Sequence, residues 1–145
     1  ITKIGKTNDA PDLLFAVGTQ GVWRSTNFGG SWSLNAAKLF PDELDASVIY
    51  YRQVTDDEEV LRPISTPVLG LFAAADTGIK QESVESFRDA MQRLIKNYEI
   101  HIYPGVGHAF ANPTGSNYDA VAAEDAWRRT LEFLDHHLSI DVSAD

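Results

Sequence analysis

The chain has 145 residues, of which 43% are hydrophobic and 23% charged, and this suits a single globular domain with a substantial core. Its net charge of −9 argues against a surface for nucleic acid or for anionic membranes, because both require clustered Lys and Arg. The absence of cysteine excludes disulfides, a thiolate nucleophile and zinc–thiolate sites.

The first third of the chain predicts a β-hairpin and a short helix. Apolar runs at 13–18 and 21–26 predict two strands, and Gly18 and Gly21 flank a tight turn between them. The paired glycines of Asn27-Phe-Gly-Gly then break the chain. Residues 33–40 predict a helix that is stopped by Pro41.

The rest of the chain alternates strands with helices. β-branched and apolar runs predict strands at 46–51, 67–74 and 98–103, and the acidic segment 55–59 predicts a solvated loop. Helical spacing of apolar residues predicts helices at 82–97 and 117–138. Their buried stripes are expected to comprise Val84, Phe87, Met91, Leu94 and Ile95, and Val121, Trp127, Leu131, Leu134 and Leu138.

This element order predicts an α/β fold with crossover helices around a parallel sheet of about four strands. Such a small sheet leaves long apolar edges, which must be covered by the 13–26 segment or by another chain. We therefore expect a homo-oligomer.

Polar residues follow the ends of two predicted strands. Asp76 comes just after the strand at 67–74, and His108 follows the strand at 98–103 in a loop with two glycines. In an α/β sheet, catalytic groups gather at the carboxyl ends of the strands. Upstream, Asn27 sits in a glycine-rich turn between a strand and a helix, as in a nucleophile elbow. The order elbow, Asp, His is that of an α/β-hydrolase, in which the acid orients the imidazole.

Residues 27–138 resemble the C-terminal half of a dienelactone hydrolase. The resemblance rests on Phe28-Gly-Gly, Leu34-Asn-Ala-Ala, Val48-Ile-Tyr-Tyr, Pro67-Val-Leu-Gly-Leu-Phe with Asp76, and Tyr103-Pro-Gly-Val-Gly-His-Ala-Phe, and it extends to Trp127 and Leu134. It implies an incomplete α/β-hydrolase fold in 27–145, after a lead-in and hairpin at 1–26. It also implies hydrolysis of a carboxylic ester or lactone, with Asp76 orienting His108 and with no cofactor or metal.

Several positions depart from the family pattern. Asn27 occupies the position of the family's cysteine nucleophile, and an amide cannot replace a thiolate. Asn112 stands where some members carry a carboxylate-binding arginine, and Arg52 replaces a glycine. A full member is about twice as long, and its other half donates one oxyanion N–H. We therefore expect activity to be weak or lost, with Ser25 or Ser31 as alternative nucleophiles.

Two other interpretations remain open, one for the N-terminal segment and one for the whole chain. Residues 13–32 resemble a single Asp-box hairpin of sialidase-like propellers, with Asn27 in place of the aspartate. The whole chain could instead be a non-catalytic binding or assembly module that uses the open sheet edge or the old pocket. His101 is expected to be exposed or half-buried, and the His136–His137 pair is expected to lie at a solvated helix end rather than to bind a metal. The absence of a long apolar run or a signal-like start leads us to expect a cytoplasmic protein without membrane contacts.

Overall fold

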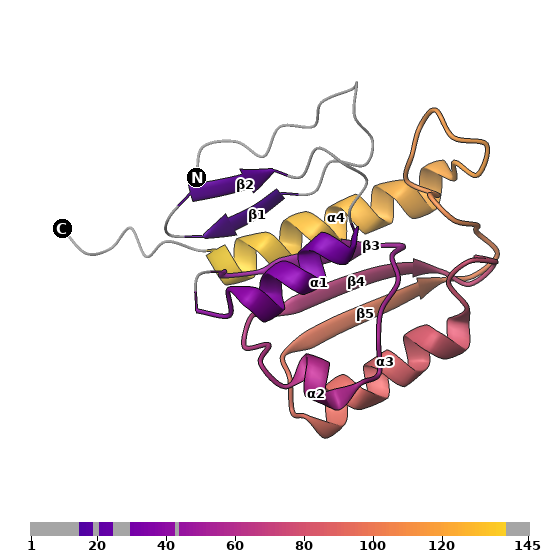
Figure 1. Ribbon diagram of the computed structural model, residues 1–145. Helices are drawn as coiled ribbons and strands as arrows, with labels where there is room; N and C mark the ends of the chain where they lie inside the picture. The colour runs from indigo at the N-terminus through magenta and orange to yellow at the C-terminus, as the bar shows by residue number, and fades with distance from the viewer. Residues whose placement is uncertain (1–14, 19–20, 25–29, 43, 139–145) are drawn as a thin grey trace.

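The computed structural model describes residues 15–18, 21–24, 30–42 and 44–138 (Figure 1). Two separate sheets and four helices are present in these segments. The elements are β1 (Phe15–Gly18), β2 (Gly21–Arg24), α1 (Gly30–Leu39), β3 (Ser47–Tyr50), α2 (Glu58–Leu61), β4 (Val68–Ala73), α3 (Gln81–Arg93), β5 (Tyr98–Tyr103) and α4 (Ala120–Leu138).

The parallel sheet has the order β3-β4-β5 within the described residues. Strands β1 and β2 form an antiparallel pair in which Phe15 lies opposite Arg24 and Gly18 opposite Gly21, as predicted. The described part of the chain therefore holds three parallel strands where the sequence predicted about four. The three are the strands predicted at 46–51, 67–74 and 98–103, and the hairpin strands that were also predicted pair only with each other.

The central strand β4 is buried along its whole length and faces a cluster on each side. Val68 and Phe72 pack with α1 and α3 on one face, whereas Leu69 and Leu71 pack with α4 on the other. Alternate side chains of a strand point to opposite faces, so a continuous apolar run fills both layers. The fold is thus a three-layer α/β/α arrangement (Figure 1).

The expected buried stripes of the two long helices are only partly correct. In α3, Val84, Phe87 and Met91 are buried, but Ile95 is 92% exposed because the helix ends at Arg93 and Ile95 takes a positive φ of 55°. In α4 the buried residues are Ala122, Ala126, Thr130 and Phe133, which lie three or four residues apart along one face. Val121 and Leu131 are exposed.

The acidic segment at 55–59 is not entirely a loop. Asp57 caps the short helix α2, because its Oδ1 accepts a hydrogen bond from the Glu59 amide at 3.0 Å. The apolar residues that follow explain why the chain turns inward here: Leu61 and Ile64 are buried against the α3 side of the sheet. No helix in the segments that the structure describes is long and apolar enough to cross a membrane.

The two outer strands of the parallel sheet differ in what lies beside their outward-facing edges. On the free side of β5, the Arg88 guanidinium donates to the outward-facing carbonyl of Ile100 at 3.3 Å. On β3, the amides of Ser47 and Tyr51 donate to Pro67 and Leu71 of the β4 segment. The N–H and C=O groups of every second residue between them point away from β4. The described residues place no strand beside these groups.

Candidate active site

Asp76 and His108 lie beside each other at the carboxyl end of the parallel sheet. Asp76 follows β4 and His108 follows β5, and these strands are neighbours. Two main-chain hydrogen bonds continue the pairing beyond the strands: the Ala74 amide donates to Tyr103 O at 2.9 Å, and the Ala75 amide donates to Val106 O at 3.0 Å. The two loops therefore leave the sheet side by side and bring the carboxylate and the imidazole together.

The Asp76 carboxylate is buried and uses both of its oxygens. Its side chain is 1% exposed, and Oδ2 lies 2.7 Å from Nδ1 of His108. Oδ1 accepts the amides of Gly78 at 2.8 Å and Ile79 at 2.9 Å. Burial alone would raise the pKa of Asp76, but the hydrogen bonds from Ile79, His108 and Gly78 outweigh burial and lower that pKa. The carboxylate is therefore held in its ionised form.

The ionised Asp76 fixes the tautomer of His108. A carboxylate without a proton can only accept hydrogen bonds, so Nδ1 of His108 must carry the proton that is shared at 2.7 Å. Nε2 is then the nitrogen with a free lone pair in the neutral ring. The side chain of His108 is 45% exposed, so Nε2 is accessible to water or to a small substrate. This arrangement can remove a proton from a reacting hydroxyl or water.

Three aromatic rings in successive contact lead from the imidazole into the core. The Tyr51 ring meets the His108 ring edge-on at a centroid distance of 5.4 Å, and Phe110 meets Tyr51 at the same distance. Phe110, which is fully buried, also contacts the Tyr103 ring at 4.9 Å. Tyr51 has a positive φ of 33°, which is unusual for a bulky residue and directs its ring from the end of β3 toward the site.

Sequence reasoning missed one residue that contacts the histidine loop. Asn117, which lies between the loop and α4, donates from Nδ2 to the main-chain carbonyl of His108 at 3.0 Å. No periodicity or motif marks this asparagine, because a polar residue in a loop is the ordinary case.

Of the other predicted positions, Asn112 and the His136–His137 pair lie within the described residues and have no hydrogen bond to this pair among those residues. Asn27 and Ser25 lie outside the described residues, and the Ser31 main chain lies in the first turn of α1. Asn112 forms its own turn, in which its Oδ1 accepts the Thr114 amide at 3.1 Å. Near the end of α4, the rings of His136 and His137 lie 4.7 Å apart.

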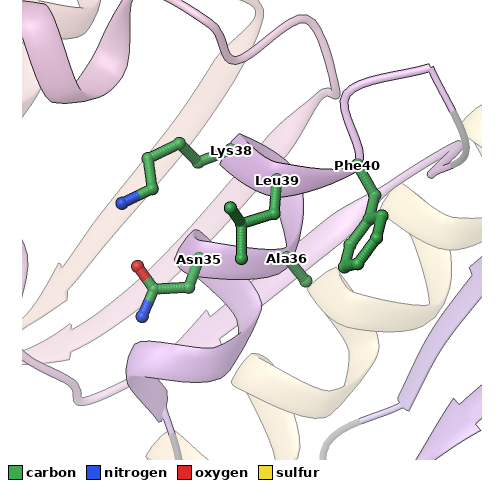
Figure 2. A pocket seen from close by; sticks show the side chains of 5 residues that line it. All are labelled: Asn35, Ala36, Lys38, Leu39 and Phe40. Atoms are coloured by element: carbon green, nitrogen blue, oxygen red, sulfur yellow. The ribbon is translucent and has the colours of Figure 1, made fainter.

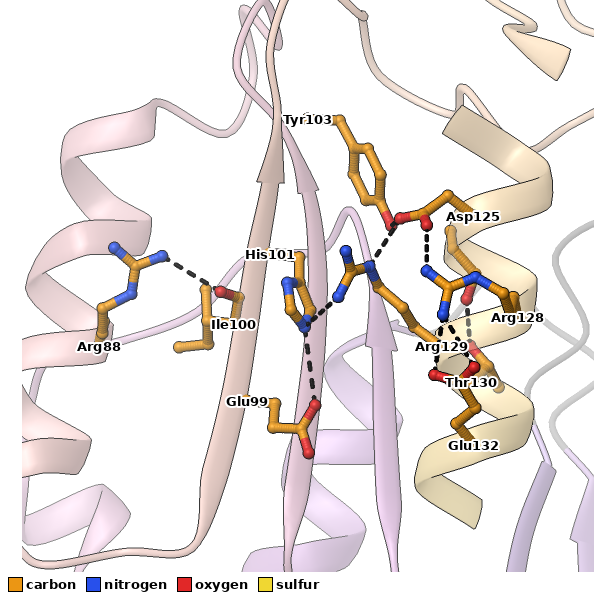
Figure 3. Close-up of polar contacts among 11 residues, drawn as sticks. Arg88, Glu99, Ile100, His101, Tyr103, Asp125, Arg128, Arg129, Thr130 and Glu132 are labelled. Carbon is orange, nitrogen blue, oxygen red and sulfur yellow. Dashed lines mark hydrogen bonds and ion pairs between the residues drawn. The ribbon is translucent and has the colours of Figure 1, made fainter. Parts of the chain in front are cut away.

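A second polar cluster covers the face of β5 toward α4 (Figure 3). Asp125 accepts hydrogen bonds from the Tyr103 hydroxyl at 2.8 Å and from Arg129 Nε at 2.6 Å, and it also pairs with Arg128. These donors hold the pKa of Asp125 well below its usual range. His101 lies 3.4 Å from Arg129, and burial and that positive charge lower the pKa of His101. The cluster is internally paired and ties β5 to α4.

A shallow groove of about 380 Å³ lies at the end of α1 and is lined by Asn35, Ala36, Lys38, Leu39 and Phe40 (Figure 2). Leu39 is 65% exposed and Phe40 is 46% exposed. A helix that leads into a parallel strand ends at the amino edge of the sheet, and so this groove lies at the edge opposite Asp76 and His108.

Comparisons with known proteins identify the family of the chain. The model of the dienelactone hydrolase family matches residues 27–138. A "Putative carboxymethylenebutenolidase" of Escherichia coli is 38% identical over 101 residues, which are 63% of this chain and 37% of that protein. A protein of the same name from Saccharolobus solfataricus is 34% identical over 122 residues, covering 81% of this chain and 46% of the relative.

Solved structures show the same fold. A "Putative Dienelactone Hydrolase" of Klebsiella pneumoniae superimposes with a TM-score of 0.65 at 29% identity, over 73% of this chain and 48% of that one. A dienelactone hydrolase-like promiscuous phosphotriesterase from metagenomic libraries gives a TM-score of 0.67 at 22% identity, over 76% and 49%. The chain thus spans less than half the length of each of these relatives.

The family match covers most of the chain and includes both residues of the buried pair and the strands that carry them. The protein has an α/β-hydrolase fold in part, and it belongs to the dienelactone hydrolase family.

Proposed function

We propose that this chain carries the acid–base pair of a hydrolase for carboxylic esters or lactones, with Asp76 as the orienting acid and His108 as the base. The observation that supports this most directly is the 2.7 Å contact between Nδ1 of His108 and the buried Asp76 carboxylate. The substrate class follows from the family and from relatives named carboxymethylenebutenolidase, a name that denotes a lactone substrate. No cofactor or metal is needed for this chemistry.

In the reaction that we propose, Nε2 of His108 removes a proton from a water molecule as its oxygen attacks the carbonyl carbon. The Asp76 carboxylate stabilises the imidazolium that forms, because it is negatively charged and already accepts the hydrogen bond from Nδ1–H. The tetrahedral intermediate then collapses, and the leaving alkoxide takes the proton back from Nε2. The products are a carboxylic acid and an alcohol, or a hydroxy acid from a lactone.

We propose further that this chain hydrolyses esters weakly or not at all, because Asn27 stands at the position of the family nucleophile. Without a covalent step, the water route must supply the entire rate. Each missing oxyanion donor would lower the rate by a further ~10²–10³-fold.

The first test is hydrolysis of p-nitrophenyl acetate by the purified chain and by His108→Ala. Free imidazole also cleaves activated esters, so His136→Ala is the matched control: His136 is exposed and lies on α4. A rate above that of buffer that falls in His108→Ala, but not in His136→Ala, supports the proposal. Equal losses in the two variants would mean that the observed rate is surface imidazole chemistry.

The second test restores the nucleophile. Asn27→Cys should release a burst of p-nitrophenolate that is removed by adding His108→Ala. Gln92→Cys, on the exposed side of α3, is the control for an ordinary surface thiol. If both cysteine variants give a burst of the same size, and neither burst changes when His108→Ala is added, the assignment of Asn27 to the nucleophile position is refuted.

A second candidate function is self-assembly through the β3 edge, and one observation favours it: the outward peptide groups of β3 have no strand beside them in the described residues. A second copy of the chain could supply that strand. Light scattering over a range of concentrations tests this candidate. The mass of two or more chains would support it, and the mass of one chain at every concentration would refute it.

A further inference from the structure

We infer that Asn117 is a positioning residue that holds His108 in register with Asp76, an inference that rests on the proposed function. The main-chain carbonyl of His108 accepts the Asn117 Nδ2 proton at 3.0 Å, while the imidazole of the same residue meets Asp76 at 2.7 Å. His108 is therefore fixed at its backbone and at its ring by two different segments.

The contact is steric as well as polar. Gly107 precedes His108, and a Cβ at that position would lie 3.2 Å from both Cγ and Nδ2 of Asn117. The amide of Asn117 thus lies directly over the Cα of Gly107. A side chain at this position would press on the amide, which would have to shift by a few tenths of an ångström and would disturb its hydrogen bond to His108.

The loop needs such a support because its backbone is strained immediately after the histidine. Ala109 takes a positive φ of 62°, a left-handed conformation that brings the Cβ of an L-residue too close to the following carbonyl oxygen. Phe110 anchors the far side of this residue in the core, where its carbonyl accepts the Asp119 amide at 2.9 Å. Asn117 anchors the near side through His108.

A series of turns returns the chain to the site so that Asn117 can make this contact. The Asn112 amide donates to Ala109 O at 2.9 Å, the Gly115 amide donates to Asn112 O at 3.0 Å, and the Tyr118 amide donates to Gly115 O at 3.2 Å. Residues 109–118 therefore form a closed loop that is supported by its own hydrogen bonds. We assign to this loop the task of limiting how far the imidazole can swing away from Asp76.

The experiment measures the Asp76–His108 contact itself rather than hydrolysis. Proton NMR detects a downfield Nδ1–H resonance of His108, and the ¹³Cγ shift of Asp76 follows its titration. Asn117→Ala removes the donor, and Asn117→Asp removes it at constant size. Ser116→Ala, at the neighbouring exposed position, is the control. Circular dichroism and thermal unfolding show whether each variant is folded.

In both Asn117 variants we expect the Nδ1 proton to exchange about fivefold faster, the factor that corresponds to one net hydrogen bond. We also expect Asp76 to titrate at a higher pH, moving toward its value in His108→Ala. Ser116→Ala should match the wild type. If folded Asn117 variants keep both signals unchanged while His108→Ala shifts the Asp76 titration, the positioning role is wrong but the pair stands. If His108→Ala leaves the Asp76 titration unchanged, the proposed pair itself fails.

Discussion

Replacing Asp76 with alanine removes three hydrogen bonds at once. The Ile79 amide is buried, and leaving it without an acceptor costs about 1–3 kcal/mol. The Gly78 amide and the His108 ring are more exposed, so water replaces much of what they lose. Removing a carboxylate from a buried position offsets part of the loss. We therefore expect Asp76→Ala to lower the free energy of unfolding by about 1–2 kcal/mol at pH 7.

Asp76→Asn separates hydrogen bonding from charge. Its Oδ1 can still accept from Gly78 and Ile79, so we expect a loss of only about 1 kcal/mol at pH 7. Its Nδ2 would face Nδ1 of His108 and donate to it, which moves the ring proton to Nε2. The imidazole would then present a donor where the proposed mechanism needs a base.

The pH dependence of stability provides the refuting result. The pKa of Asp76 is lower in the folded than in the unfolded chain, so its carboxylate stabilises the fold above the unfolded value, near pH 4, and this contribution is lost as the pH falls further. Urea unfolding from pH 7 to pH 2.5 should therefore show the wild type and Asp76→Asn converging at low pH. A constant difference between them, or an Asp76→Ala loss below about 0.5 kcal/mol, would refute this account of the carboxylate.

Three further variants probe the structure around the site, each by urea unfolding. Phe110→Ala should cost about 3–5 kcal/mol, because the ring is fully buried between two tyrosines, and a loss below 1 kcal/mol would contradict that packing. Gly70→Ala should cost about 1–3 kcal/mol, because its Cβ would lie 2.6 Å from Cε2 of Phe72; an unchanged midpoint would show that the ring can move aside. Tyr50→Phe should cost about 1 kcal/mol, because the 2.8 Å bond to Thr130 Oγ1 is lost while Thr130 still donates to Ala126 O; a gain in stability would argue against that bond.

The proximity of Asp76 and His108 could be predicted from the sequence because it follows from topology. Asp76 and His108 each come soon after a strand, and successive parallel strands joined by a helix are usually neighbours in the sheet. The apolar run of β4 was equally informative, because burial on both faces allows few polar residues. These features depend on patterns that extend over many residues.

Features that depend on local geometry could not be predicted in this way. Hydrophobicity favoured Val121 and Leu131 for the buried face of α4, yet the sheet is lined instead by Ala122 and Ala126, whose small side chains let the helix approach closely. Ile95 matched the helical period of α3 but falls beyond its last turn. The hydrogen bond from Asn117 depends on the exact path of a loop, and no sequence pattern specifies that path.

The two main-chain bonds that join the loops after β4 and β5 have a consequence for hydrogen exchange. Because the Ala74 and Ala75 amides extend the sheet ladder into the site, they should be protected almost as strongly as the amides of β4 itself. The acid and the base would then open only together with the central sheet, as part of one cooperative unit. The main chain that leads to Asp76 and toward His108 would therefore stay in place for as long as the sheet is folded, and only the side chains and the later part of the His108 loop could move independently of it.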